Sequence, residues 1–84
     1  MKGERKTRLG SLKKGDQALI TQVGNAESSI ELVERLLEIG ILEGSRVEVV
    51  HEAPFGKDPI AVRVRGSLVA LRRHEANAIE VEIL

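Results

Sequence analysis

Two His-Glu pairs are the residues of this sequence best suited to hold a metal ion. They are His51-Glu52 and His74-Glu75. Imidazole and carboxylate groups suit Fe²⁺, Zn²⁺ or Ni²⁺, but no second histidine follows either pair at the spacing that puts two ligands on one helix face. A site would therefore have to form across the fold or between two chains. Otherwise both histidines are surface residues, so we expect weak transition-metal binding at most and no cofactor.

A nucleophile with a neighbouring general base is missing. The chain has no cysteine. Of its five serines, Ser28 fits a helix cap, and Ser45 and Ser67 fit turns. The glycine-containing stretch "GILEG" lacks the lysine of a phosphate-binding loop. Without these constellations the sequence predicts a protein that is not an enzyme.

The remaining candidates for function are apolar residues in turns, which could contact another protein. Phe55 is the only aromatic residue, and it lies between Pro54 and Gly56 in the loop "EAPFGKDP". It is either an exposed tip or a core residue folded back over the sheet. Leu42 and Glu43, in the turn after a predicted helix, form a second candidate contact.

The elements that position these residues show two different apolar periods. Ser28 and Glu31 have the spacing of a capping box at the start of a helix, and Gly40 suits the left-handed residue that ends it. Gly44 then reverses the chain. From Arg46 the apolar period becomes two, which is typical of a strand.

Further segments alternate in the same way and predict a small β fold. Residues 60–66 place Ile60, Val62 and Val64 on one side, and Gly66 turns the chain into a strand over 68–73. A single helical turn over 74–78 precedes a last strand over 78–84, and a first strand covers 17–25. We predict a mostly β fold with one inserted α-helix, an SH3-like small barrel of about five strands. It would be a single domain over residues 9–84, after a flexible basic tail at residues 1–8.

Composition excludes several classes of function. The 13 basic residues balance the 13 acidic ones, and one aromatic residue cannot supply a stacking platform, so no nucleic-acid partner is expected. No apolar run approaches the roughly 20 residues that span a bilayer, and the basic N-terminus leads into no apolar signal segment. We therefore expect a cytoplasmic protein without membrane insertion.

Three stretches together resemble the FeoA family over residues 9–83: "RLLEIGILEGSRVEVV", "APFGKDPIAVRVRG" and "LVALRRHEANAIEV". The resemblance implies an SH3-like, non-catalytic accessory protein of ferrous iron uptake, which binds the cytosolic part of the membrane GTPase and permease FeoB and regulates it. The same fold in iron-dependent repressors leaves an alternative open, a transition-metal-responsive or nucleic-acid-binding module with another partner. A homo-oligomer is also open. One departure from the family loop is Lys57, inserted between Gly56 and Asp58.

Overall fold

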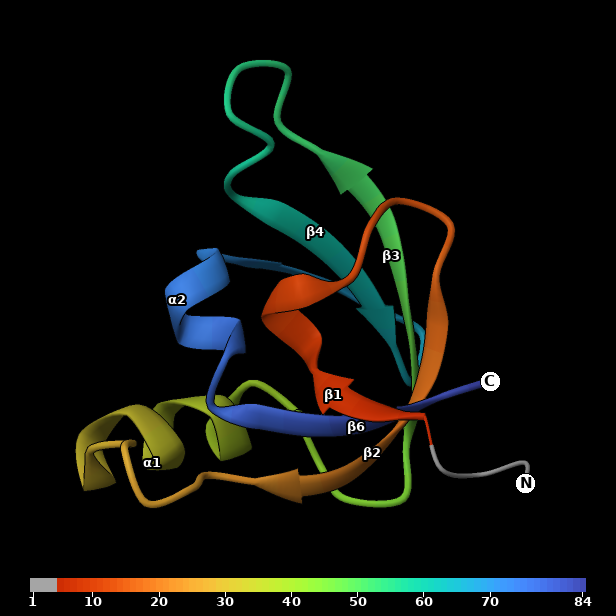
Figure 1. The fold of residues 1–84 in the computed structure, drawn as a ribbon. Coiled ribbons are helices and arrows are strands. Elements are labelled where there is room, and N and C mark those ends of the chain that lie inside the picture. The colour runs from red at the N-terminus through yellow and green to blue at the C-terminus, as the bar shows by residue number, and fades with distance from the viewer. Residues whose placement is uncertain (1–4) are drawn as a thin grey trace.

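The computed structural model describes residues 5–84. It is mostly β, with one main helix inserted between the second and third strands (Figure 1), which confirms the predicted class. The elements in chain order are β1 (Lys6–Arg8), a 3-10 turn η1 (Leu9–Ser11), β2 (Gln17–Val23), α1 (Ile30–Glu38), β3 (Arg46–Glu52), β4 (Ile60–Val64), β5 (Ser67–Leu71), α2 (Arg73–Ala76) and β6 (Ile79–Ile83).

The strands form one curled antiparallel sheet in the order β1-β6-β2-β3-β4-β5. β1 and β5 are the two edges, so the sheet does not close into a complete barrel. The pairing of β3 with β4 shifts between Val49 and His51, which is a bulge or irregularity in β3. A bulge bends a strand and increases its twist, and this contributes to the curl of the sheet.

Strand β1 corrects the expected tail at residues 1–8. Lys6 lies opposite Glu82 and Arg8 lies opposite Glu80 on β6. These cross-strand pairs of opposite charge favour pairing without the apolar alternation that would reveal a strand in the sequence. The fold therefore has six strands rather than about five, and residues 1–4 of the predicted tail lie outside the described residues.

The core consists of aliphatic side chains. In strands such as β4, every second residue points to the same face of the sheet and is buried there. Val62 and Val64 on β4 are buried while Arg63 between them is exposed, as the period of two predicts. The same alternation runs through β3 and β6, and the core also includes η1. Fully buried large side chains are Leu9, Ile20, Leu36, Ile41, Ile60, Ile79, Val47, Val49, Val62, Val64 and Val81.

Helix α1 begins one residue later than its capping pattern predicted. Ser29 is the N-cap, and its hydroxyl accepts a hydrogen bond from the Leu32 N–H at 3.1 Å. Ser28 instead bonds Asn25, with its hydroxyl 3.0 Å from the Asn25 backbone nitrogen. The predicted capping box of Ser28 and Glu31 is therefore wrong, because Ser28 closes the preceding turn.

The end of α1 lies where the sequence placed it. Gly40 has a φ of +100°. Its N–H donates to the Leu37 carbonyl at 3.1 Å, and the Ile41 N–H donates to the Leu36 carbonyl at 3.0 Å. These two bonds define a Schellman motif with Gly40 at C′.

The apolar stripe of α1 is only partly covered. Leu36 is fully buried and Leu32 packs against the core, but Ile30 is 73% exposed and Leu37 is 44% exposed. Among the described residues no helix is both long and apolar enough to cross a membrane.

Candidate protein-interaction site

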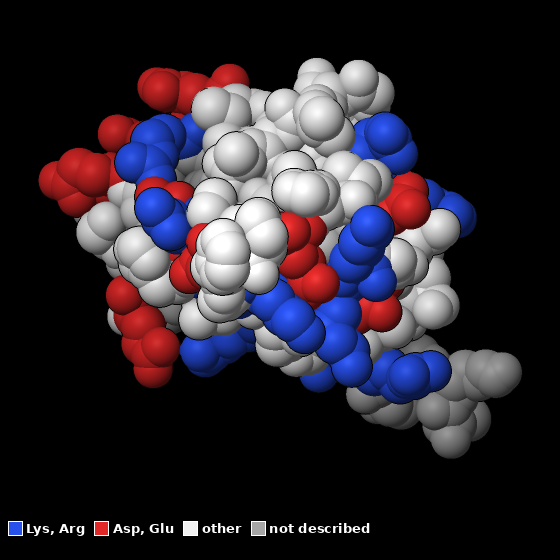
Figure 2. Space-filling view, turned by 90° about the horizontal axis from the view of Figure 1, so that it is seen from above, with Lys and Arg blue, Asp and Glu red and all other residues white. Residues whose placement is uncertain are grey.

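The loop between β3 and β4 carries Phe55 at its tip. Gly56 and Lys57 both have positive φ, +76° and +58°, and turn the chain there. The Ala53 N–H donates to the Pro59 carbonyl at 3.1 Å and closes the base of the loop. Phe55 is 90% exposed, so it is an apolar projection and not part of the core. Figure 2 looks down on this end of the molecule, where basic and acidic side chains both lie beside uncharged surface.

Arg73, at the start of α2, holds the base of this loop. Its Nε donates to the Lys57 carbonyl at 2.8 Å, and its backbone N–H donates to Asp58 Oδ1 at 3.0 Å. Its Nη2 bonds Glu52 Oε2 at 2.7 Å, and both side chains of this ion pair are largely buried. The positive φ of Lys57 is unfavourable for a residue with a Cβ, and the bond to its carbonyl helps to hold that conformation.

The same guanidinium also bonds η1. Its Nη1 donates to the carbonyls of Gly10 at 3.0 Å and Leu12 at 2.7 Å. A guanidinium offers five N–H donors in a planar fork, so Arg73 can join β3, the loop and η1 at one point. Sequence reasoning missed Arg73, because its partners at residues 10 and 12 lie about sixty positions away.

Gly10 allows this close approach of η1 to α2. A Cβ at Gly10 would overlap the Arg73 backbone carbonyl and the side-chain amide of Asn77, whose Cγ would be 2.9 Å away. The contact involves α2 backbone, so a side chain at residue 10 would displace the helix. No local feature of the sequence distinguishes Gly10 from a glycine that only turns the chain.

The second candidate contact, the turn after α1, lies at the opposite end of the molecule (Figure 1). Leu42 is 39% exposed and Glu43 is exposed. Gly44 has a φ of +86°, and its N–H donates to the Ile20 carbonyl at 2.8 Å, which ties the turn to β2. The structure therefore does not bring Leu42 and Glu43 together with Phe55.

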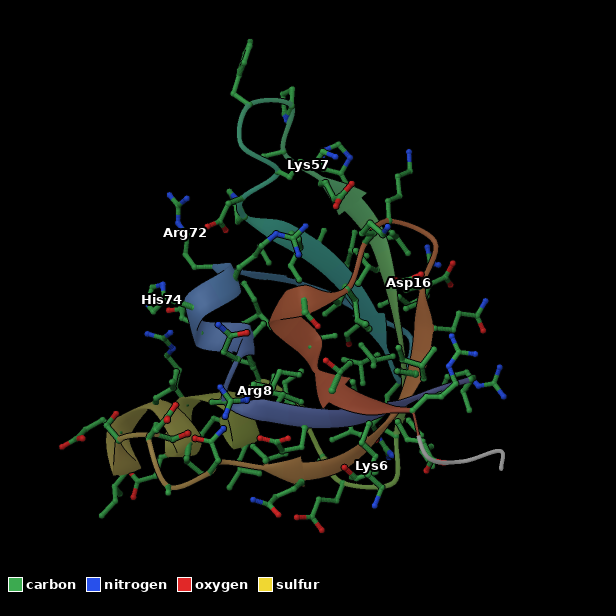
Figure 3. The ribbon with its side chains drawn as sticks, viewed as in Figure 1. Lys6, Arg8, Asp16, Lys57, Arg72 and His74 are labelled. Atoms are coloured by element: carbon green, nitrogen blue, oxygen red, sulfur yellow. The ribbon has the colours of Figure 1, made fainter. Side chains whose placement is uncertain are left out.

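The four candidate metal ligands are also not brought together. Glu52 is bound by Arg73. Glu75 pairs with Arg35 and accepts the Arg72 N–H at 3.0 Å. His51 and His74 are exposed on β3 and α2, and Figure 3 shows His74 on α2. Within residues 5–84 no three His, Asp or Glu side chains gather in a group that could hold a metal ion.

Glu75 also caps α2. The Arg72 N–H bond lowers the pKa of Glu75 most, burial opposes this, and Arg35 lowers the pKa further. This bond from the Arg72 N–H to Glu75 is one of the two bonds of a capping box. The other is missing, because the guanidinium of the N-cap residue Arg72 has no atom that could accept a hydrogen bond from the helix N–H groups.

A groove between α1 and α2 was not predicted from the sequence. Its volume is about 600 Å³, and it is lined by Glu27, Ser29, Glu31, Leu32, Arg35, His74 and Glu75. Its lining carries three glutamates, one arginine and one histidine, and the Arg35–Glu75 ion pair crosses between the helices. Arg35 and Glu75 are forty residues apart in the chain, so local patterns could not place the two helices side by side.

Comparison with known proteins gives consistent matches over nearly the whole chain. The family model described as the FeoA domain matches residues 7–83. A Porphyromonas gingivalis Fe(2+) transport protein A/Fe(2+) transporter FeoB fusion protein is 40% identical over 77 residues, which are 92% of this chain and 9% of that protein. This chain thus spans about a tenth of the length of that relative.

Solved structures share the fold. The FeoA protein from Chlorobium tepidum is 37% identical, with a TM-score of 0.80 over 93% of this chain and 70% of that one. FeoA from Stenotrophomonas maltophilia, determined in complex with zinc and described as a prokaryotic SH3 domain protein, is 29% identical, with a TM-score of 0.77 over 89% and 88% of the two chains. These matches confirm the expected SH3-like fold.

Proposed function

This chain belongs to the FeoA family, and from that premise we propose that it binds the cytosolic part of a FeoB-like transporter and regulates ferrous iron uptake. The support is the relative in which a FeoA part and FeoB form one polypeptide, since fused proteins commonly act together. In this proposal the protein is a cytoplasmic accessory factor and hydrolyses no nucleotide itself.

The primary contact in this proposal is the loop tip with Pro54, Phe55 and Gly56. The observation that carries it is the 90% exposure of the only aromatic side chain. Aromatic residues are enriched among the side chains that dominate binding energy, and Phe buries roughly 150–200 Å² when it enters a pocket. Because Arg73 braces the loop base, little backbone entropy would be lost on binding.

Leu42 and Glu43 would make a separate, secondary contact. The molecule measures 35 × 30 × 24 Å, and the two sites lie at opposite ends. A small regulatory interface, below about 1,200 Å², covers one end only. A partner that reaches both sites must therefore be large or contact the protein with two segments.

The proposal can be tested by measuring Fe²⁺ uptake under anaerobic, iron-limited growth. A deletion strain should lose uptake, and wild type should restore it. Phe55→Ala should fail to restore uptake although its circular dichroism spectrum is unchanged. Ile30→Ala is the matched control, because it removes another highly exposed apolar side chain at a site outside the proposed contacts, and it should restore uptake.

Two results would contradict different parts of the proposal. Unchanged uptake in the deletion strain would exclude a role in ferrous iron transport. Full complementation by Phe55→Ala, together with normal uptake by Ile30→Ala, would exclude the loop as the contact and leave the transport role in place.

A further inference from the structure

Strand β5 is an unprotected edge of the sheet. It consists of Ser67-Leu68-Val69-Ala70-Leu71, without charge, proline or bulge. Natural proteins usually protect such edges with short strands, charged side chains or proline. The other edge, β1, follows this rule, since it is three residues long and carries Lys6 and Arg8.

The backbone of β5 offers unused hydrogen-bonding groups. Val64 and Ser67 close the two-residue turn Arg65-Gly66. From such a pair onward, residues whose N–H and C=O groups bond the neighbouring strand alternate with residues whose groups point away from it. The N–H and C=O groups of Leu68 and Ala70 therefore point away from β4. From residue 5 to residue 84, no turn, loop or cap group bonds them. The Leu68 side chain is also 64% exposed.

The surface beside this edge is basic. A depression of about 200 Å³ lies where β3, β4 and the β4–β5 turn meet, and its lining includes Arg46, Arg63 and Arg65 with Glu48 as the one acidic residue. Glu48 pairs with Arg63 at 3.6 Å. Across the described part of the chain, Arg65 has no ion-pair partner.

The outward face connects the depression to the edge. Leu68 lies opposite Arg63, which lies opposite Glu48 on β3. At the other end of β5, Arg72 is exposed, and Figure 3 shows its side chain projecting from the start of α2. Arginines therefore flank an uncharged strand at both ends, and the extended chain from Ser67 to Arg72 spans about 17 Å at 3.3 Å per residue.

We propose that the β5 edge binds an extended acidic segment of a partner protein, which adds to the sheet as a further strand. The backbone of the segment would bond Leu68 and Ala70, an apolar side chain would cover Leu68, and carboxylates would meet Arg65 and Arg72. Main-chain bonds supply affinity and alternate side chains supply specificity in this mode of recognition. This site is separate from the Phe55 loop and does not depend on that contact.

Charge argues against a second copy of this chain as the occupant. In an antiparallel pair of β5 strands centred on Val69, the Gly66 end of one copy lies beside the Arg72 end of the other. Arg65 would then approach the exposed Arg72 of the second molecule, and like charges across strands are destabilising. An acidic segment replaces this repulsion with attraction.

The test uses a capped heptapeptide that alternates Glu and Val, followed by amide NMR of the whole protein. Binding should shift the amide signals of Leu68 and Ala70 and slow their hydrogen exchange. Two control peptides separate the contributions. One has Lys in place of Glu, and the other keeps every Glu but is N-methylated at alternate amides, so it cannot form a ladder. Neither should bind comparably.

Protein variants test the edge and the charge separately. Leu68→Pro removes an outward N–H at an edge position that tolerates proline, and affinity should fall at least about tenfold. Arg65→Asn removes one charge but creates an Asn-Gly turn, which favours this hairpin, so affinity should fall about two- to fivefold while the fold is retained. Lys14→Gln, on an exposed loop, removes the same charge elsewhere and should leave affinity unchanged.

Several outcomes would overturn the proposal. They are the absence of shifts at Leu68 and Ala70 at about 1 mM acidic peptide, equal binding of the N-methylated peptide, and shifts confined to another surface. The same shifts produced by a single-stranded oligonucleotide would indicate a general anion surface. Broadening of the β5 signals with protein concentration alone would identify a second copy as the occupant.

Discussion

Replacement of Arg73 by alanine should remove a large part of the stability of this protein. The side chain donates four hydrogen bonds, to Glu52 at 2.7 Å and to the carbonyls of Lys57, Gly10 and Leu12 at 2.8, 3.0 and 2.7 Å. It is 22% exposed and the Glu52 side chain is 15% exposed. The truncation would therefore leave a mostly buried carboxylate without its cation, and three carbonyls without this donor.

The expected loss follows from these contacts. Removing one partner of a buried ion pair costs about 3–5 kcal/mol. Because the Arg73–Glu52 pair retains some exposure, and water can reach part of it, we take the lower end, about 3 kcal/mol. The free energy of unfolding of a domain of this size is roughly 4–13 kcal/mol, so the truncation would remove a substantial fraction of it. The β3–β4 loop and η1 should both loosen, since Arg73 is their common bond donor.

Equilibrium urea unfolding measures this effect. With a slope of about 1 kcal/mol per molar urea, the midpoint should fall by about 3 M. Arg73→Lys keeps the charge but not the planar fork, so its loss should be smaller but clear. Arg72→Ala is the matched control, since the neighbouring arginine is exposed, and it should change stability by about 0.5 kcal/mol or less. A midpoint shift below about 1 M for Arg73→Ala, with an unchanged slope, would refute the assignment of Arg73 as the bond donor on which these segments depend.

Four further outcomes can be measured. Gly40→Ala should lower the free energy of unfolding measured in urea melts by about 1–2 kcal/mol. The whole loss should come from the positive φ, which is unfavourable for alanine, because a Cβ at this position meets no atom within 4 Å. Val64→Ala should cost about 1–3 kcal/mol and Arg63→Ala about 0.5 kcal/mol or less; the reverse order would contradict the observed register. The folded state lowers the pKa of Glu75 below its ordinary 4.5. The ionised Glu75 side chain therefore adds to the stability of the protein above its unfolded-state pKa, and this stabilisation is lost as the pH falls through its folded-state pKa. Wild type should thus exceed Glu75→Gln in stability at neutral pH, and the two should converge as the pH falls through the lowered pKa of Glu75. Calorimetric titration with Zn²⁺ should give micromolar or weaker binding, and a nanomolar site lost on replacement of either histidine would contradict the separation of the candidate ligands.

Features that depend on neighbouring residues could be predicted from the sequence. The end of α1 at Gly40 rests on bonds that span at most five residues, and only glycine readily adopts its φ of +100°. The alternation of Val62, Arg63 and Val64 follows from the pleat of a single strand. The exposed loop tip was one of two open readings for Phe55, and the structure decided between them.

Features that depend on which distant segments meet could not be predicted in this way. Two capping serines stand side by side, and Ser29 rather than Ser28 caps α1 because Ser28 bonds Asn25. Strand β1 has no apolar pattern, and its cations lie opposite acidic residues only because it pairs with β6. Neither choice is visible in a local window of sequence.

Tertiary structure also decided the arrangement of the candidate sites. The amino-acid sequence alone determined that the chain is mostly β, has no cysteine and carries one aromatic residue in a loop. Only the folded chain placed Arg73 at the point where β3, the loop and η1 meet, and put the β3–β4 loop and the turn after α1 at opposite ends (Figure 1). The physical reason is that side-chain periodicity arises within one element, whereas a hydrogen bond across sixty residues exists only after the strands have paired.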